Sequence, residues 1–187
     1  MIRRKLDAYY SPDAAASALV GLLPIRTTDK VLEPHAGGGA FVRALLPVAG
    51  QVHARDIDAD AAGLALVPGW RRGVGDWFEA QPLDLHDWII GNPPFAGAEE
   101  HVRHALKMSK RHVAFLLRLG FLESATRHSF WQEHPARRVW VLVERPSFQR
   151  KGEDKASGKT DGRAYGFYWW DKEHTGETVL DHVSWKT

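Results

Sequence analysis

The chain has 187 residues, a formal net charge of +2 at pH 7, 44% hydrophobic and 26% charged residues. These values are typical of one folded globular domain and exclude a disordered chain, a fibre and a coiled coil. The absence of cysteine excludes disulfides, zinc–thiolate sites, iron–sulfur clusters and a cysteine nucleophile. No apolar run approaches the roughly 20 residues of a membrane span, and no apolar signal segment follows the basic residues 1–5, so we expect a cytoplasmic protein without a membrane partner.

Strand-like and helix-like segments alternate over the first half of the chain, which is typical of βαβ units around a parallel sheet. Ser11 is a candidate N-cap, and Pro12 opens a helix that runs to about residue 23. The elements expected next are a strand at 30–34, a glycine turn at 37–39, a helix at 40–47, a strand at 51–56, a helix at 58–66, and strands at 70–75 and 86–91.

The second half continues this alternation with an expected helix at 98–108, strand at 112–118, helix at 122–133 and strand at 138–143. Residues 145–163 then hold six Lys or Arg against three Asp or Glu, which predicts a long, mobile basic loop. The runs at 165–170 and 178–185 predict two antiparallel edge strands whose tryptophans pack in the core. We therefore expect one α/β domain over residues 1–187, with a doubly wound, mostly parallel sheet and an antiparallel C-terminal edge hairpin.

Three successive strand ends carry residues suited to an adenosine-containing ligand. Gly37-Gly38-Gly39 would let a ligand approach the backbone because glycine has no Cβ, although an ordinary tight turn has the same sequence. Asp56, about 20 residues further on, suits the two hydroxyls of a ribose or, alternatively, a helix N-cap. Asp76 beside Trp77 and Phe78 suits the amine and the ring face of an adenine, or a capped loop above two core aromatics. Together the three elements favour the ligand.

The tetrad Asn92-Pro93-Pro94-Phe95 follows the strand at 86–91. Two consecutive prolines lack N–H groups and have fixed φ, so this segment cannot continue a central strand or enter a helix. The Asn92 side chain and the Pro93 carbonyl would offer two acceptors to a planar NH₂ group, and Phe95 a ring for a flat heterocycle. A rigid turn with a buried Phe is the alternative, and the glycine turn upstream makes the amine site the favoured interpretation.

These motifs together resemble the S-adenosylmethionine-dependent adenine-N6 DNA methyltransferases, in particular small phage- and prophage-type members. The matching stretches are Tyr10-Ser11-Pro12, the run from Glu33 to Phe41 (EPHAGGGAF), Asp56, Asp76-Trp77-Phe78 and Asn92-Pro93-Pro94-Phe95, together with Arg145-Pro146-Ser147-Phe148, the basic loop and Tyr165–Trp170. The resemblance spans about residues 9–170 and implies a Rossmann-like class I methyltransferase fold with a seven-stranded sheet. His35 and Gly38 stand at positions that the family fills variably.

The resemblance implies S-adenosylmethionine as the cofactor and no metal. Its cofactor-binding residues would be Tyr10 and Ser11 at the amino-acid end, Glu33, Gly37 and Gly39 around the methionine, Asp56 at the ribose, and Asp76 with Trp77 or Phe78 at the adenine. Its catalytic tetrad would be Asn92 and Pro93, which bind the target amine, together with Pro94 and Phe95, whose ring stacks on the target base.

The substrate implied by the resemblance is adenine in a nucleic acid, with DNA favoured over RNA. The same tetrad also serves enzymes that methylate RNA base amines or protein glutamine, and a non-catalytic nucleic-acid-binding module of the same fold is a further alternative. Larger family members carry a separate target-recognition domain, for which this chain has no room. Target choice would therefore come from the 145–163 loop, a partner chain or homodimer, or low selectivity.

Two histidines and several basic residues remain outside these motifs. His101 and His104 stand at i, i+3, a spacing found in metal sites, but we expect them on an exposed helix face. Basic residues outside the loop, at positions 3–5, 107, 110 and 111, are candidate phosphate contacts.

Overall fold

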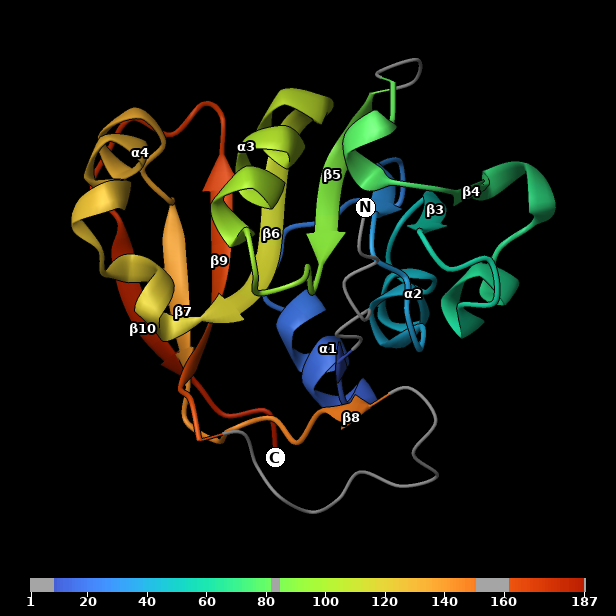
Figure 1. Ribbon diagram of the computed structural model, residues 1–187, viewed down its shortest axis with the longest axis horizontal. Coiled ribbons are helices and arrows are strands. Elements are labelled where there is room, and N and C mark those ends of the chain that lie inside the picture. Colours follow the sequence, from blue (N-terminus) through green and yellow to red (C-terminus); the bar gives the residue numbers. More distant parts are fainter. Residues whose placement is uncertain (1–8, 82–84, 151–161, 187) are drawn as a thin grey trace, which may run out of the picture.

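The computed structural model describes residues 9–81, 85–150 and 162–186. Within them, the main sheet has the order β10-β7-β9-β6-β5-β2-β3-β4, and its parallel strands point down in Figure 1. The strands of this sheet are β2 (Lys30–Glu33), β3 (Gln51–Asp56), β4 (Arg72–Val74), β5 (His86–Gly91), β6 (Ser109–Arg118), β7 (Arg138–Leu142), β9 (Tyr165–Asp171) and β10 (Val179–Val183). A separate antiparallel ladder joins β1 (Tyr9–Tyr10) to β8 (Gln149–Arg150).

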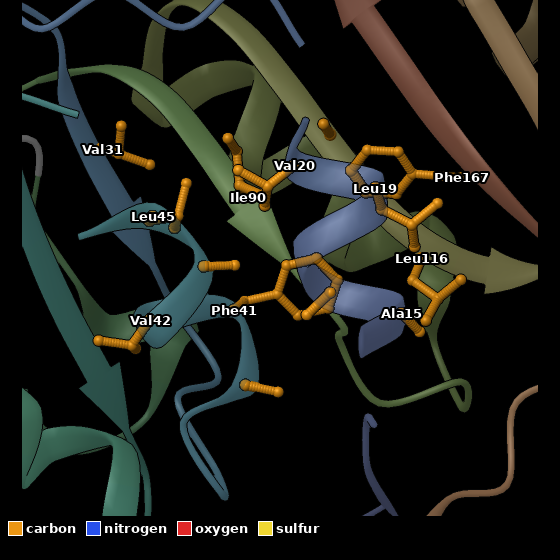
Figure 2. Close-up of a cluster of buried hydrophobic side chains, with 14 of the residues drawn as sticks. Ala15, Leu19, Val20, Val31, Phe41, Val42, Leu45, Ile90, Leu116 and Phe167 are labelled. Carbon is orange, nitrogen blue, oxygen red and sulfur yellow. The ribbon is translucent and has the colours of Figure 1, made fainter. Parts of the chain in front are cut away.

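Helices cover both faces of the sheet because side chains alternate between the faces along each strand. On one face, Val31, Ile90, Leu116 and Phe167 pack against α1 and α2 (Figure 2). On the other face, their strand neighbours pack against α3 and α4. The helices are α1 (Asp13–Val20), α2 (Ala40–Leu45), α3 (Ala98–Met108) and α4 (His128–Glu133). The predicted doubly wound α/β architecture is confirmed.

The chain reverses its direction of travel across the sheet between β2 and β5. From β2 it continues to β3 and β4 on one side, and it then returns to place β5 on the other side of β2. In open α/β sheets, a ligand crevice lies at such a switch point, at the carboxyl ends of the strands. The segments that follow β2 and β5 contain the glycine turn and the Asn-Pro-Pro-Phe tetrad.

The predicted edge hairpin at the C-terminus is wrong in its pairing. β9 runs antiparallel between β6 and β7, which confirms an antiparallel C-terminal strand, but it lies inside the sheet. β10 pairs parallel with β7 at the edge and not with β9. Every residue of β9 except Asp171 is buried, as expected for a strand covered on both faces. The main sheet thus has eight strands, one more than the resemblance implies.

One predicted helix is replaced by a short 3₁₀ helix, and another is α-helical only in its second half. Only Ala62–Leu66 of the segment 58–66 is helical (η1), because the Gly63 N–H donates to the Gly37 carbonyl at 2.9 Å, so the segment is tied to the glycine turn. In the segment 122–133, η5 (Ala125–Arg127) precedes α4, and η4 (Leu119–Leu122) ends at the first residue of the segment; Ser124, with φ 155°, lies between η4 and η5. The strand expected at 70–75 shortens to β4, preceded by η2 (Gly69–Arg71).

Residues 148–150 of the predicted basic loop belong to the ordered fold. Phe148 is buried, and β8 pairs with β1, so residues 148–150 are not free loop. Residues 151–161 lie outside the described residues, as do the basic residues 3–5. Arg111, one of the candidate phosphate contacts, donates to Asp29 at 2.7 Å. This contact lies near the start of β2 and away from the glycine turn.

Among the helices described, none has the length and apolarity needed to cross a membrane.

Candidate active site

The glycine turn is held by the carboxylate of Asp56. Gly37 and Gly39 have φ of 42° and 87°, conformations that side-chain-bearing residues seldom adopt. Asp56 Oδ2 accepts from the Gly37 N–H at 2.8 Å, and its Oδ1 accepts from the Asp58 N–H at 2.9 Å. Each oxygen keeps acceptor capacity, because a carboxylate oxygen has more than one lone-pair site. Asp56 therefore ties β3 to the turn and can still accept from a ligand.

Glu33 ends β2 beneath the same turn and is only 1% exposed. It accepts from the His35 N–H at 2.9 Å. A Cβ on Gly91 would overlap the Glu33 carboxylate, so the glycine that precedes the tetrad provides the space for this side chain. Burial raises the pKa of Glu33 well above its usual range; the His35 N–H bond opposes that rise, and the Asp56 charge adds to it.

The Asn92 amide is fixed by the N-terminal segment. Its Nδ2 donates to the Ser11 hydroxyl at 3.1 Å and to the Tyr9 carbonyl at 3.3 Å. Its Oδ1 is buried and has no hydrogen-bond partner among the described residues. A buried acceptor without a donor costs roughly 1–3 kcal/mol, and such atoms in folded proteins call for an explanation. A ligand N–H would provide the missing donor.

Phe95 belongs to an aromatic group assembled from four separate segments of the chain. Its ring lies 6.2 Å from Tyr9, 5.8 Å from Phe148 and 5.4 Å from Tyr165, measured between centroids. The Arg118 guanidinium lies 4.9 Å from the centroid of the same ring, within the range of cation–π attraction. The tetrad is therefore joined to both the N-terminal segment and the start of the basic segment.

One cavity of about 640 Å³ brings the predicted site residues together. All of them line it except Phe78: Tyr10, Ser11, Glu33, Gly37, Gly39, Asp56, Asp76, Trp77, Asn92, Pro93, Pro94 and Phe95. A volume of this size suits a ligand as large as a nucleoside derivative. The switch point of the sheet thus carries a pocket whose lining is polar at the glycine turn and aromatic at the tetrad.

The structure distinguishes between the two aromatic residues that follow Asp76. Asp76 caps η3 (Trp77–Glu79) by accepting from the Phe78 N–H at 2.9 Å. Trp77 is 4% exposed and lines the cavity, whereas Phe78 is 42% exposed and contacts the rings of His101 and His104 instead. Trp77 is therefore the residue of this pair that a cavity ligand could touch.

The cavity also contains residues that the sequence interpretation missed or misplaced. Ile57 and Tyr9 line it, as do His35 and His101. The expectation that His101 lies on an exposed helix face is wrong, because it is 8% exposed and its Nδ1 lies 3.1 Å from His35 Nε2. A signal was present in the sequence: His101 precedes Ala105 by four positions and Met108 by seven, which places it on the apolar face of α3.

Both histidines of this pair are disfavoured as cations. Burial lowers the pKa of His35 well below its usual range, and the neighbouring His101 lowers it further. Burial also lowers the pKa of His101 from 6.5 to about 4, with Asp76 opposing the shift and His104 adding to it. The two rings therefore form a neutral N–H···N contact at physiological pH. Among the described residues, no three ligating side chains are grouped so as to hold a metal ion.

We expect His101→Gln to reduce the acid sensitivity of the fold. Folded His101 binds its proton less readily than unfolded His101, so the unfolded state takes up protons as the pH falls from 6.5 towards 4, and stability is lost in that window. Between pH 7 and pH 5, His101 lowers the free energy of unfolding by about 2 kcal/mol. Urea unfolding at pH 7 and at pH 5 measures this loss, which should be about 2 kcal/mol smaller in His101→Gln than in the unchanged chain.

The matched control for this measurement is His182→Gln, which changes an exposed histidine on β10. That variant should lose as much stability on acidification as the unchanged chain. If His101→Gln lost as much stability as the unchanged chain, the lowered pKa assigned to buried His101 would be contradicted.

Comparisons with known proteins agree on the fold. No family model matches the chain. The chain is 31% identical over 114 residues to the type II methyltransferase M.TthHB8I of Thermus thermophilus, a match that covers 57% of this chain and 26% of that protein. A chain of a type I restriction–modification system superimposes with a TM-score of 0.68 at 14% identity, over 93% of this chain and 44% of the other. The 23S rRNA methyltransferase ErmE superimposes with a TM-score of 0.61 at 17% identity, over 87% and 69%.

The chain therefore has the α/β Rossmann-like fold that these methyltransferases share. Its sequence is distantly similar to a type II methyltransferase, of whose length it spans about a quarter.

Proposed function

We propose that the chain transfers a methyl group from S-adenosylmethionine to the exocyclic N6 amine of adenine in DNA. The observation that carries the proposal is the fixed Asn92 amide, whose buried Oδ1 lacks a donor beside the cavity. An adenine amine is a planar NH₂ group and would supply that donor. The proposal extends the coarser conclusion from the fold by naming the target atom.

The residues of the tetrad would act on the amine by accepting its two hydrogen bonds. The lone pair of an aromatic amine is delocalised into the ring, which makes the nitrogen a poor nucleophile. Acceptance by Asn92 Oδ1 and the Pro93 carbonyl favours a pyramidal nitrogen and stabilises the positive charge that develops there. When bound, the cofactor supplies a sulfonium methyl group that is already activated for attack. Alignment of the two reactants contributes much of the rate, up to about 7–11 kcal/mol in favourable cases.

The cofactor would lie along the carboxyl ends of β2, β3 and β4. In this proposal Tyr10 holds the amino-acid end, Gly37, Gly39 and Glu33 flank the methionine, Asp56 accepts from the ribose, and Asp76 with Trp77 holds the adenine. The fit is supported by buried polar atoms in the cavity lining without partners among the described residues, namely His35 Nδ1 and Trp77 Nε1. Phe78 has no part in the proposal because it does not line the cavity.

We favour DNA over RNA as the substrate because the relative matched in sequence is a type II methyltransferase and a chain of a type I restriction–modification system shares the fold. Phe95 also contacts Phe148, which belongs to the basic run of sequence at 145–163. Such a run suits the backbone of either nucleic acid. A base in a duplex must leave the stack at a cost of a few kcal/mol, and stacking on Phe95 would offset roughly 1–3 kcal/mol of that.

The experiment that tests the proposal supplies methyl-labelled S-adenosylmethionine with DNA, RNA or protein extract, and digests the products to identify the labelled group. We expect label in N6-methyl-2′-deoxyadenosine from DNA. Label in RNA nucleosides would favour activity on RNA base amines, and ErmE, a 23S rRNA methyltransferase, shares the fold. Label in glutamine would move the substrate to protein. Absence of cofactor binding by calorimetry would instead support a non-catalytic module.

A further inference from the structure

The segment Tyr9–Ser11 connects three parts of the site. Tyr9 and Tyr10 pair with Arg150 and Gln149 across the β1–β8 ladder. The ring of Tyr10 lies against the glycine turn, where a Cβ on Gly37 or Gly38 would approach it to 3.1 or 3.0 Å. Ser11 was expected to cap α1, but Pro12 occupies the N-cap position and no side chain caps that helix. The Ser11 hydroxyl is therefore directed to a different partner.

That partner is the side-chain amide of Asn92. A backbone carbonyl can only accept a hydrogen bond, so the group of Asn92 that faces the Tyr9 carbonyl at 3.3 Å must be its NH₂. The same NH₂ donates to the Ser11 hydroxyl at 3.1 Å. With both of its hydrogens engaged, the amide cannot exchange the positions of Nδ2 and Oδ1 without losing two bonds. The acceptor oxygen is thereby turned away from the segment.

We propose that Ser11, together with the Tyr9 carbonyl, is a positioning residue that sets the Asn92 amide with its oxygen towards the target amine. This inference rests on the proposed function and deepens it. It also differs from the role that the family resemblance gives to Ser11, which is contact with the amino-acid end of the cofactor. If Ser11 contacts the cofactor, changing it should raise the Kd for S-adenosylmethionine. If Ser11 positions Asn92, the same change should lower kcat.

The effect follows from what the amide does when one acceptor is removed. In Ser11→Ala the NH₂ keeps only the longer bond to Tyr9, and the amide plane is free to rotate. When Nδ2 faces the target amine, the NH₂ group of Asn92 meets the NH₂ group of the substrate. Two donors cannot form a hydrogen bond, so this orientation is unproductive. Small errors of alignment lower rates by up to about a hundredfold, so we expect kcat to fall by roughly tenfold to a hundredfold.

The activity experiment compares four proteins: the unchanged chain, Ser11→Ala, Ser11→Thr and Ser184→Ala. Ser184 is an exposed serine that donates to Glu144, and neither residue lines the cavity, so it serves as the matched control. We expect Ser11→Ala to lower kcat with little change in the Kd for S-adenosylmethionine or the KM for the amine substrate. Ser11→Thr, which keeps the hydroxyl, should restore most of kcat. A loss in Ser11→Ala that appears as weaker cofactor binding would overturn the positioning role.

A second readout does not depend on catalysis. Asn92 is the sole asparagine of the sequence, so selective ¹⁵N-asparagine labelling gives one side-chain NH₂ signal. Its hydrogens should exchange with solvent on the order of fivefold faster in Ser11→Ala, and at the unchanged rate in Ser184→Ala. Unaltered exchange in Ser11→Ala overturns the inference. Lack of methyl transfer by the unchanged chain would refute the proposed function alone, because the exchange comparison still decides the role of Ser11.

Discussion

Replacing Asn92 with alanine should abolish methyl transfer while cofactor binding stays nearly intact. The substitution removes the buried Oδ1 that would accept from the target amine, and it leaves the glycine turn and the carboxylates of Glu33 and Asp56 in place. Removal of one group that stabilises transition-state charge costs on the order of a hundredfold to a thousandfold in kcat. The measurement is transfer of labelled methyl to DNA at saturating cofactor.

Calorimetry with S-adenosylmethionine supplies the control for this variant. Its Kd should lie close to that of the unchanged chain, because Asn92 belongs to the proposed amine site. Turnover at the unchanged rate would remove Asn92 from the catalytic role. Loss of cofactor binding together with turnover would show instead that the contact of Asn92 with Tyr9 and Ser11 holds the cofactor site itself.

Replacing Asp56 with alanine should weaken cofactor binding. The carboxylate holds the Gly37 N–H at 2.8 Å and the Asp58 N–H at 2.9 Å, and in our proposal it also accepts from the ribose. Hydrogen bonds to charged groups are worth about 1.5–3 kcal/mol each, so the Kd for S-adenosylmethionine should rise by roughly tenfold to a hundredfold. Calorimetry gives the Kd, and thermal unfolding shows whether the variant is folded.

The matched control for Asp56→Ala is Asp60→Ala, which removes an exposed carboxylate four residues further on and outside the cavity lining. Its Kd should equal that of the unchanged chain. An Asp56 variant that folds and binds the cofactor with unchanged affinity would refute the ribose role and leave Asp56 as a backbone tie for the glycine turn.

The two variants should also separate in their response to cofactor concentration. Excess cofactor should recover much of the activity of the Asp56 variant, because the tetrad is unchanged there. It should recover none of the activity of the Asn92 variant, because the amine acceptor is missing at any concentration. This contrast would assign the Asp56 end of the cavity to cofactor binding and the Asn92 end to methyl transfer.

The pairing errors of the sequence interpretation have a common physical origin. The run at 165–170 consists wholly of aromatic residues and glycine, which is typical of a strand covered on both faces, yet we expected it at an edge of the sheet. The insertion of β9 between β6 and β7 depends on contacts with strands about 25 and 50 residues away in the sequence. Local patterns do not encode such partners.

The helix errors arose where other hydrogen bonds replace helical ones. The 58–66 segment has helix-forming alanines and leucines, but Gly63 packs on the Ala36 backbone and donates to Gly37, a partner that only folding brings near. The 122–133 segment is interrupted by local contacts instead. The Ser124 hydroxyl accepts from the Thr126 N–H at 3.2 Å, and Arg127 donates to the carbonyls of Phe121 and Gly120. Such side-chain bonds to the nearby backbone compete with the helix.

The sequence by itself determined the strand–turn–helix order, the positions of the glycine turn and the tetrad, and the convergence of both at one edge of a parallel sheet. Those features follow from local chemistry: side-chain periodicity, missing Cβ atoms, and prolines without N–H groups. Only the tertiary structure decided that Trp77 and not Phe78 faces the cavity, that His101 is buried against His35, and that Ser11 holds Asn92. Ser11 and Asn92 stand 81 positions apart, and their contact exists because folding places the N-terminal segment over the end of β5.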